Sequence, residues 1–165
     1  MLARLVERDL KTGLNPSREL LIVTLGNYYE AKGVQEWVAR AFSDRGINYF
    51  IPGNTHPNVL EPHWRDKDPN SFWCEGAVTL SRIHQAKGNE ADVVYVVGFD
   101  NVAQREDDIN ARNQIFVALT RSKGFAHLSG VGEQPMFAEM REVMGCGETL
   151  SFTFKRPPKR EIVDE

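Results

Sequence analysis

Two segments of the chain carry the residue types that could bind a ligand. The first runs from Val78 to Glu90, and after a short apolar run it places an arginine, a histidine and a lysine in a polar stretch. Ligands of α/β sheets bind beyond the carboxyl ends of the strands, so this position favours ligand binding. The second segment runs from Ala111 to Lys123. Its periodicity predicts a helix with Arg121 close to the carboxyl end.

The sequence signatures of free-standing enzymes are missing. The chain has no Gly-x-x-x-x-Gly-Lys-Ser/Thr loop to hold nucleotide phosphates, and Gly88 in the polar stretch is followed by Asn89. It has no Gly-x-Gly-x-x-Gly fingerprint and no nucleophile elbow around a serine. We expect no metal site, because the cysteines and histidines lack the spacing of metal ligands. These residues are Cys74, Cys146, His56, His63, His84 and His127.

Length and composition indicate one globular domain. The 165 residues suit a single domain, and the hydrophobic fraction of 41% and charged fraction of 26% are close to globular averages. A net charge of −3 argues against a self-sufficient nucleic-acid binder, so any such contact must be local or shared with another domain. No apolar run reaches the roughly 18 residues of a membrane span, and the first residues lack a signal peptide. We therefore expect a cytoplasmic protein without membrane contact.

Apolar periodicity predicts alternating helices and strands along the chain. Apolar residues spaced by three and four predict amphipathic helices, and short continuous apolar runs predict strands that are buried on both faces. The helices are expected over 2–10, 28–44, 107–122 and 135–144, and the strands over 19–25, 47–51, 77–80, 91–98, 125–128 and 149–154. This order predicts an α/β fold with a mostly parallel sheet flanked by helices.

The same patterns predict how the domain is organised. The first two strands and the helix between them form a βαβ unit, so these strands should be parallel. Residues 52–74 hold four prolines and are expected to form an irregular connection. The charged residues 155–165 should be a solvated tail, which leaves one domain over 1–154. Trp37 and Phe42 lie at helical spacing, and both rings are expected in the core rather than stacked on bases.

The two segments resemble motifs of a known family, the UvrD/Rep-type superfamily I helicases, in their second RecA-like domain. Val78–Glu90 is similar to motif V, whose core reads Thr-(Ile/Val)-His-x-Ala-Lys-Gly-x-Glu. Ala111–Lys123 resembles motif VI, with its Val-Ala-Leu-Thr-Arg-(Ala/Ser)-Lys core. The motifs occur in the family's order with a buried strand between them. Residues 19–53 also resemble the family's strand–helix–strand ending in Gly-Ile-Pro-Tyr, so the resemblance covers residues 1–154. It implies the RecA-like fold of a second P-loop NTPase motor domain.

The resemblance also implies roles for individual residues. Arg121 matches the arginine finger of motif VI, which reaches the γ-phosphate of ATP held between two motor domains. A permanently charged planar fork suits that role, because it stabilises the charge on the transferring phosphoryl group. Glu90 matches an acid that accepts a hydrogen bond from the nucleotide ribose, and Gly88 with Lys87 matches the turn that couples ATP to DNA. Three further residues match positions on the single-stranded DNA backbone: Thr79, Arg82 and His84.

At several positions the sequence departs from the family. Arg82 stands where threonine is usual. Its side chain either adds a phosphate contact or points elsewhere. Phe116 replaces a tyrosine and lacks its hydroxyl, and Asn89 and Ala91 replace bulky apolar residues. The arginine of motif IV has no counterpart, and the chain is expected to begin after it. Residues 52–74 stand where many relatives insert a whole subdomain, and this stretch is too short to hold one.

Simpler roles stay open for the same residues. Arg121 at the end of a helix is stabilised by the helix dipole without any ligand. Glu90 could cap its turn or pair with Lys87. His84 could be an ordinary surface histidine, and Arg82 a solvated residue at the sheet edge.

The resemblance implies that this chain is the C-terminal motor domain of an ATP-dependent UvrD-like DNA helicase. It would supply the arginine finger and part of the grip on single-stranded DNA. An N-terminal RecA-like domain of the same protein would share the ATP and bind the Mg²⁺, and the chain alone would be inactive. The alternatives are a non-motor interaction scaffold with a decayed helicase fold, and an ATPase that acts on RNA or translocates without unwinding. The oligomeric state is left open.

Overall fold

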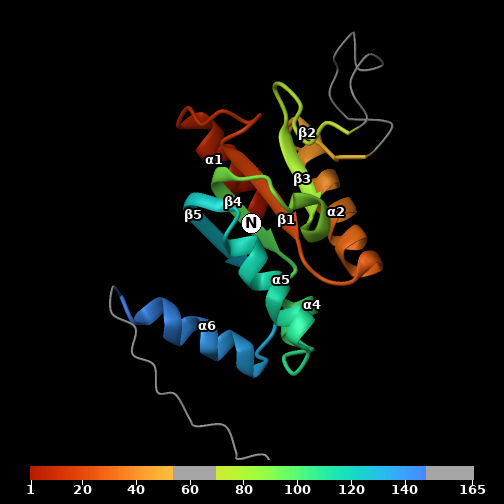
Figure 1. Cartoon of the computed structure of the whole chain (residues 1–165). Helices are drawn as coiled ribbons and strands as arrows, with labels where there is room; N and C mark the ends of the chain where they lie inside the picture. Colours follow the sequence, from red (N-terminus) through yellow and green to blue (C-terminus); the bar gives the residue numbers. More distant parts are fainter. Residues whose placement is uncertain (54–69, 148–165) are drawn as a thin grey trace, which may run out of the picture.

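Five parallel strands in the described part of the chain form the sheet at the centre of the computed structural model (Figure 1). The strands, in chain order, are β1 (Leu20–Thr24), β2 (Tyr49–Phe50), β3 (Val78–Arg82), β4 (Ala91–Val97) and β5 (Ser122–Ser129). The helices are α1 (Leu2–Lys11), α2 (Tyr28–Ser43), α3 (Ile83–Ala86), α4 (Phe99–Ala103), α5 (Ile109–Leu119) and α6 (Pro135–Gly145). The structure describes residues 1–53 and 70–147, so the predicted strand 149–154, the tail 155–165 and most of the connection 52–74 lie outside the described residues.

Helices cover both faces of this sheet and bury it. Apolar residues of α1 and α2 form a core on one face, and those of α3 to α6 form a core on the other. Alternate residues of β1 point to the two cores, with Leu21 and Val23 on the α5 side and Leu20 and Ile22 on the α2 side. All five residues of β1 are buried, as a continuous apolar run requires in a parallel sheet. The predicted α/β fold with a parallel sheet flanked by helices is confirmed.

The strand order is β2-β3-β1-β4-β5. The first two strands of the chain are parallel, as the βαβ pattern predicts, but they are not neighbours because β3 lies between them. β1 pairs with β3 on one side and with β4 on the other, and the short β2 reaches the sheet only through Tyr49 and Phe50. Which strand fills the position next to β1 depends on pairing across the chain, and local periodicity carries no information about it.

Several elements of the second half differ from the prediction. The helices α3 and α4 are too short for periodicity to reveal them. The polar stretch after β3 begins with the single helical turn of α3. α5 ends at Leu119 rather than at Ser122, since residues 122–129 pair with β4 as strand β5. At its other end, Asp108 caps α5 by accepting a hydrogen bond from the Asn110 amide at 2.8 Å.

The prediction for the aromatic residues of α2 is half wrong. Phe42 is fully buried, as expected, but the side chain of Trp37 is 58% exposed. The buried stripe of α2 runs through Ala31, Gln35, Val38 and Phe42, and Trp37 lies beside this stripe rather than on it. Gln35 is tolerated inside because its amide donates a hydrogen bond to the Leu80 carbonyl at 2.8 Å. The prediction placed the buried stripe too close to Trp37, because it expected apolar residues on the buried face and Gln35 is polar.

A buried hydrogen bond anchors α1 to the sheet. The hydroxyl of Tyr95 in β4 donates to the carboxylate of Asp9, which also accepts from Arg8. Burial and the Asp9 carboxylate raise the pKa of Tyr95 above its usual range, so the phenol stays protonated as the donor. The imidazole of His127 in β5 stacks on the Tyr95 ring at 4.6 Å. One polar contact and one stacked pair thus tie α1, β4 and β5 together.

Candidate functional site

Two of the predicted nucleotide-binding residues meet at the amino edge of the sheet. Glu90 immediately precedes β4, and Arg121 immediately precedes β5. The parallel register pairs Ala91 with Ser122, and the Ala91 amide donates to the Arg121 carbonyl at 3.0 Å. Residues that are far apart in the sequence are therefore backbone neighbours. The pairing of β4 with β5 brings the acid and the arginine to one place.

Arg121 is held at the end of α5 by its own helix. Its Nε donates to the Val117 carbonyl at 3.1 Å, and its Nη2 contacts the Thr120 hydroxyl at 3.3 Å. Such a contact satisfies a carbonyl that the last turn of a helix leaves open. Within the described residues, no carboxylate forms an ion pair with this half-buried guanidinium. Its charge is therefore not neutralised by any carboxylate in the described part of the chain.

The turn before Glu90 depends on a glycine. Gly88 has a φ of +86°, a conformation that residues with a side chain rarely adopt. The Asn89 amide donates to the Ala86 carbonyl at 3.0 Å and closes this turn. Glu90 is exposed, and in the described part of the chain its carboxylate forms no ion pair, either with Lys87 or with Arg121. The carboxylate is therefore exposed, while the Arg121 guanidinium is turned back onto Val117 and Thr120.

The three predicted DNA-contacting residues do not lie in equivalent surroundings. Thr79 is fully buried in β3, and its hydroxyl donates to the Phe72 carbonyl at 3.1 Å. Arg82 ends the same strand at the carboxyl edge of the sheet, and His84 follows on α3 with an exposed side chain. Arg82 and His84 are therefore accessible to a ligand, whereas the Thr79 hydroxyl supports the segment that contains Phe72.

Arg82 lies in a polar pocket of about 230 Å³ beside the start of α2. Its Nε donates to the side-chain oxygen of Gln85 at 3.2 Å, and its guanidinium carbon lies 4.7 Å from the centre of the Tyr28 ring. Gln85 in turn donates to the Pro52 carbonyl at 3.1 Å. Lys32 also lines the pocket. The guanidinium is thus held in place by an amide and an aromatic face.

The start of α2 is braced against α4 at this same edge. The Asn27 side chain accepts from the Tyr29 and Glu30 amides, and Glu30 accepts from the Asn27 amide at 2.8 Å, which completes a capping box. The Glu30 carboxylate also binds Arg105, with its shorter contact at 2.7 Å. Gly26 precedes this box with a φ of +118°, and a β-carbon there would lie 2.8 Å from Glu30 Oε2. Only glycine fits between the strand end and the cap.

Glu30→Gln is expected to lower the free energy of unfolding by about 0.5–1 kcal/mol at pH 7. Burial acts to raise the pKa of Glu30, but the Asn27 amide and Arg105 outweigh it and hold this pKa below its usual value of 4.5. A carboxyl with a lowered pKa stabilises the fold above its unfolded pKa, and this contribution is lost as the pH falls through the folded pKa. Urea unfolding at several pH values should show the difference between the two proteins shrinking below pH 4.5.

A matched control for this test is Glu36→Gln on the same helix. The Glu36 carboxylate is 68% exposed and lies 3.8 Å from Lys32, so its removal should change stability little at any pH. A Glu30→Gln difference that is the same at pH 7 and at pH 3 would contradict the assigned charge interaction.

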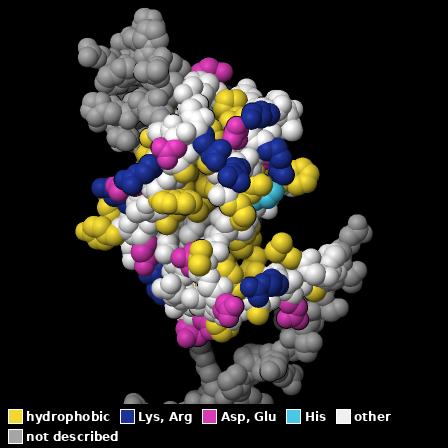
Figure 2. All heavy atoms as spheres, turned by 180° about the vertical axis from the view of Figure 1, so that it is seen from behind, with side chains coloured by type: hydrophobic (Ala, Val, Ile, Leu, Met, Phe, Trp, Pro, Cys, Tyr) yellow, Lys and Arg dark blue, Asp and Glu magenta, His cyan; other side chains and the backbone are white. Residues whose placement is uncertain are grey.

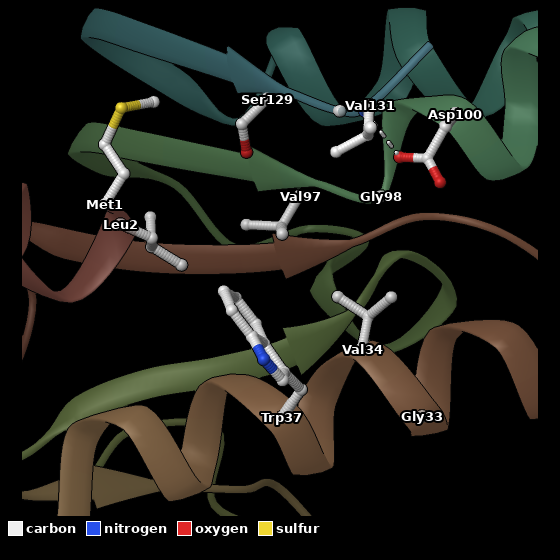
Figure 3. Close-up of a pocket in the computed structure, with 11 residues that line it drawn as sticks. Met1, Leu2, Gly33, Val34, Trp37, Val97, Gly98, Asp100, Ser129 and Val131 are labelled. Atoms are coloured by element: carbon white, nitrogen blue, oxygen red, sulfur yellow. Dashed lines mark hydrogen bonds between the residues drawn. The ribbon is translucent and has the colours of Figure 1, made fainter. Parts of the chain in front are cut away.

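A second, apolar pocket of about 450 Å³ opens at the carboxyl ends of β4 and β5 (Figure 3). Trp37 and Val34 project from α2 towards Val97 at the end of β4, and Leu2 closes one side. Sequence reasoning missed this pocket, since it placed Trp37 in the core. The polar Gln35 among the apolar residues of this helix was the available signal that the buried stripe lies elsewhere.

Charges of both signs are mixed on one face of the molecule. The face opposite to the view of Figure 1 shows Lys and Arg side chains interspersed with acidic and hydrophobic ones (Figure 2). Over residues 1–53 and 70–147 the structure brings together no group of three or more His, Cys, Asp or Glu that could hold a metal ion. None of the helices described is long and apolar enough to cross a membrane.

Comparison with known proteins gives a family for the part of the chain that carries both motifs. Residues 77–129, from just before β3 to the end of β5, match the UvrD-like helicase C-terminal domain. No curated protein matches the sequence. Among solved structures, the chain is similar to the C-terminal domain of a possible DNA helicase from Lactobacillus plantarum WCFS1. The sequence identity is 18% and the TM-score 0.47, and the match covers 83% of this chain and 68% of that one.

Proposed function

We propose that the chain is the second RecA-like motor domain of an ATP-dependent DNA helicase, because residues 77–129 match the UvrD-like helicase C-terminal domain. In this role the domain closes over ATP that is bound to an N-terminal RecA-like domain of the same protein. It supplies one cation to the phosphates and one acid to the ribose. At its other edge it holds part of a single strand of DNA.

The observation that carries the proposal is the meeting of Glu90 and Arg121 at the amino edge of the sheet. Neither charged side chain has an ion-pair partner among the described residues, and the pairing of β4 with β5 holds the two backbones together. Arg121 would leave its contacts with Val117 and Thr120 to reach the γ-phosphate, where a guanidinium stabilises the charge of phosphoryl transfer. Glu90 would accept a hydrogen bond from the ribose, and the Gly88 turn would set its position.

The chain does not hold ATP by itself in this proposal. Its sequence has no phosphate-binding loop, and the paired starts of β4 and β5 bring together Glu90 and Arg121, which fit the outer side of a shared site rather than a complete one. The phosphate loop, the Mg²⁺ ligands and the acid that orients the attacking water would come from the N-terminal domain. Hydrolysis by the 165-residue chain alone is therefore expected to be negligible.

One continuous segment links the two proposed ligand surfaces. It starts at Arg82 on the carboxyl edge, passes through α3 and the Gly88 turn, and reaches Glu90 on the amino edge. α3 also packs against α5, the helix that ends next to Arg121. A movement of α3 would therefore change the position of Arg82 and His84 relative to the nucleotide site, which is the coupling that a translocating motor needs.

The test of this function is ATP hydrolysis by the complete protein that joins this domain to its N-terminal RecA-like domain. We expect hydrolysis that single-stranded DNA stimulates, since the strand and the nucleotide contact the same linking segment. Parallel assays with RNA of the same length and with a duplex unwinding substrate separate the RNA-directed and translocase alternatives. A complete protein that neither binds ATP in a calorimetric titration nor hydrolyses it would be an interaction scaffold instead.

A further inference from the structure

Two neighbouring tyrosines are exposed at the start of α2, on the carboxyl edge of the sheet. The side chain of Tyr28 is 56% exposed and that of Tyr29 is 82% exposed. Their ring centres lie 5.3 Å apart and the ring planes are nearly perpendicular, at 86°. The capping box of Asn27 and Glu30 fixes the backbone that carries both rings. The rings are therefore held outside the core on a rigid helix end.

A cation without a carboxylate partner lies against this pair. The Arg82 guanidinium lies over the Tyr28 ring at 4.7 Å, and in the described part of the chain it contacts no acidic side chain. Lys32 follows Tyr28 by one helical turn and lines the same pocket. The acidic side chain of this pocket, Glu36, lies 3.8 Å from Lys32. Positive charge is thus in excess beside two accessible aromatic rings.

We propose that Tyr28, Tyr29 and Arg82 form a base-stacking platform for single-stranded nucleic acid. Tyr29 is the more exposed ring and stacks on a base, and Tyr28 packs against it at nearly a right angle while binding the guanidinium of Arg82. Arg82 and Lys32 contact the phosphates that flank the stacked base. The proposal rests on the proposed function, since it adds a base-contacting surface to the edge where Arg82 and His84 would hold the backbone.

The combination of groups favours nucleic acid over an uncharged ligand. Aromatic stacking accepts any base because every base has a π-face, and a nearby cation binds the backbone. The pocket beside the rings is polar, with Gln85, Glu36 and Lys32 in its lining, so it does not suit an apolar molecule. The platform therefore should bind single strands with little sequence preference, and it should distinguish strands with bases from strands without them.

The test is binding of the 165-residue chain to a fluorescent oligothymidylate of about 15 nucleotides, compared with an abasic strand of equal length. Tyr29→Ala, alone and together with Tyr28→Ala, is expected to weaken oligothymidylate binding by roughly 5- to 150-fold and to leave abasic binding unchanged. Tyr29→Phe should keep the affinity, because the ring is retained. Arg82→Gln should weaken both strands and reduce the salt dependence by about 0.7 in the log–log slope.

The matched control is Trp37→Ala, which removes another exposed aromatic ring of α2 that lines the apolar pocket instead. Equal oligothymidylate affinities for Tyr29→Ala, the double variant and Trp37→Ala would overturn the platform. Binding of oligothymidylate by the unmodified chain would still uphold the proposed function in that case. An unmodified chain and a complete protein that bind neither strand would count against the proposed function itself. Oligouridylate in place of oligothymidylate tests whether the platform accepts RNA equally.

Discussion

Replacing Arg121 by Ala in the complete motor protein is expected to lower kcat for ATP hydrolysis by about 10³- to 10⁵-fold. A guanidinium that reaches the γ-phosphate stabilises charge that develops in the transition state, so its loss affects kcat much more than KM. Arg121 is suited to this role because no carboxylate in the described part of the chain neutralises it, and it is held by contacts that are easily exchanged. Steady-state hydrolysis at saturating single-stranded DNA measures the effect.

Two variants make the Arg121 result specific. Arg112→Ala removes an arginine within α5, whose guanidinium pairs with Glu139 at 3.0 Å, and it should leave kcat within a few-fold of the unmodified protein. Arg121→Lys keeps the charge but loses the planar fork, so it should recover little of the rate. A kcat for Arg121→Ala equal to that of Arg112→Ala would remove Arg121 from the nucleotide site.

Phe42→Ala is expected to destabilise the chain by about 3–5 kcal/mol, the largest stability effect predicted for α2. The Phe42 ring is fully buried between α2 and the sheet, in the core that α1 and α2 form. Its removal loses the transfer free energy of the ring and leaves a cavity that the parallel sheet cannot close. Urea unfolding followed by circular dichroism measures the change in the free energy of unfolding.

The comparison with Trp37→Ala separates burial from residue type. Trp37 lies on the same helix and is the larger ring, but its side chain is 58% exposed. Its replacement should change the free energy of unfolding by less than about 1 kcal/mol. A loss for Trp37→Ala as large as that for Phe42→Ala would mean that both rings pack in the core, as the helical spacing alone predicts.

The sequence alone determined the positions of helices and strands, which depend on residues that are close together in the chain. The apolar runs of β1 and β4 predicted buried strands, because a strand covered on both faces needs apolar side chains at every position. Helical periodicity located α1, α2, α5 and α6 to within a few residues. The order of the two motif-like segments could also be read from the sequence. The family match over residues 77–129 agrees with the resemblance that those motifs carry.

Only the tertiary structure decided which of these elements meet. The position of β3 between β1 and β2, the pairing that joins Glu90 to Arg121, and the contact of Arg82 with Tyr28 all link residues that are distant in the chain. Thr79 matches a DNA-contacting position of its motif, yet the fold buries it and its hydroxyl donates to the Phe72 carbonyl. Strand pairing and packing between layers select such contacts through the free energy of the whole domain. Local residue types and spacing therefore do not predict which distant residues come into contact.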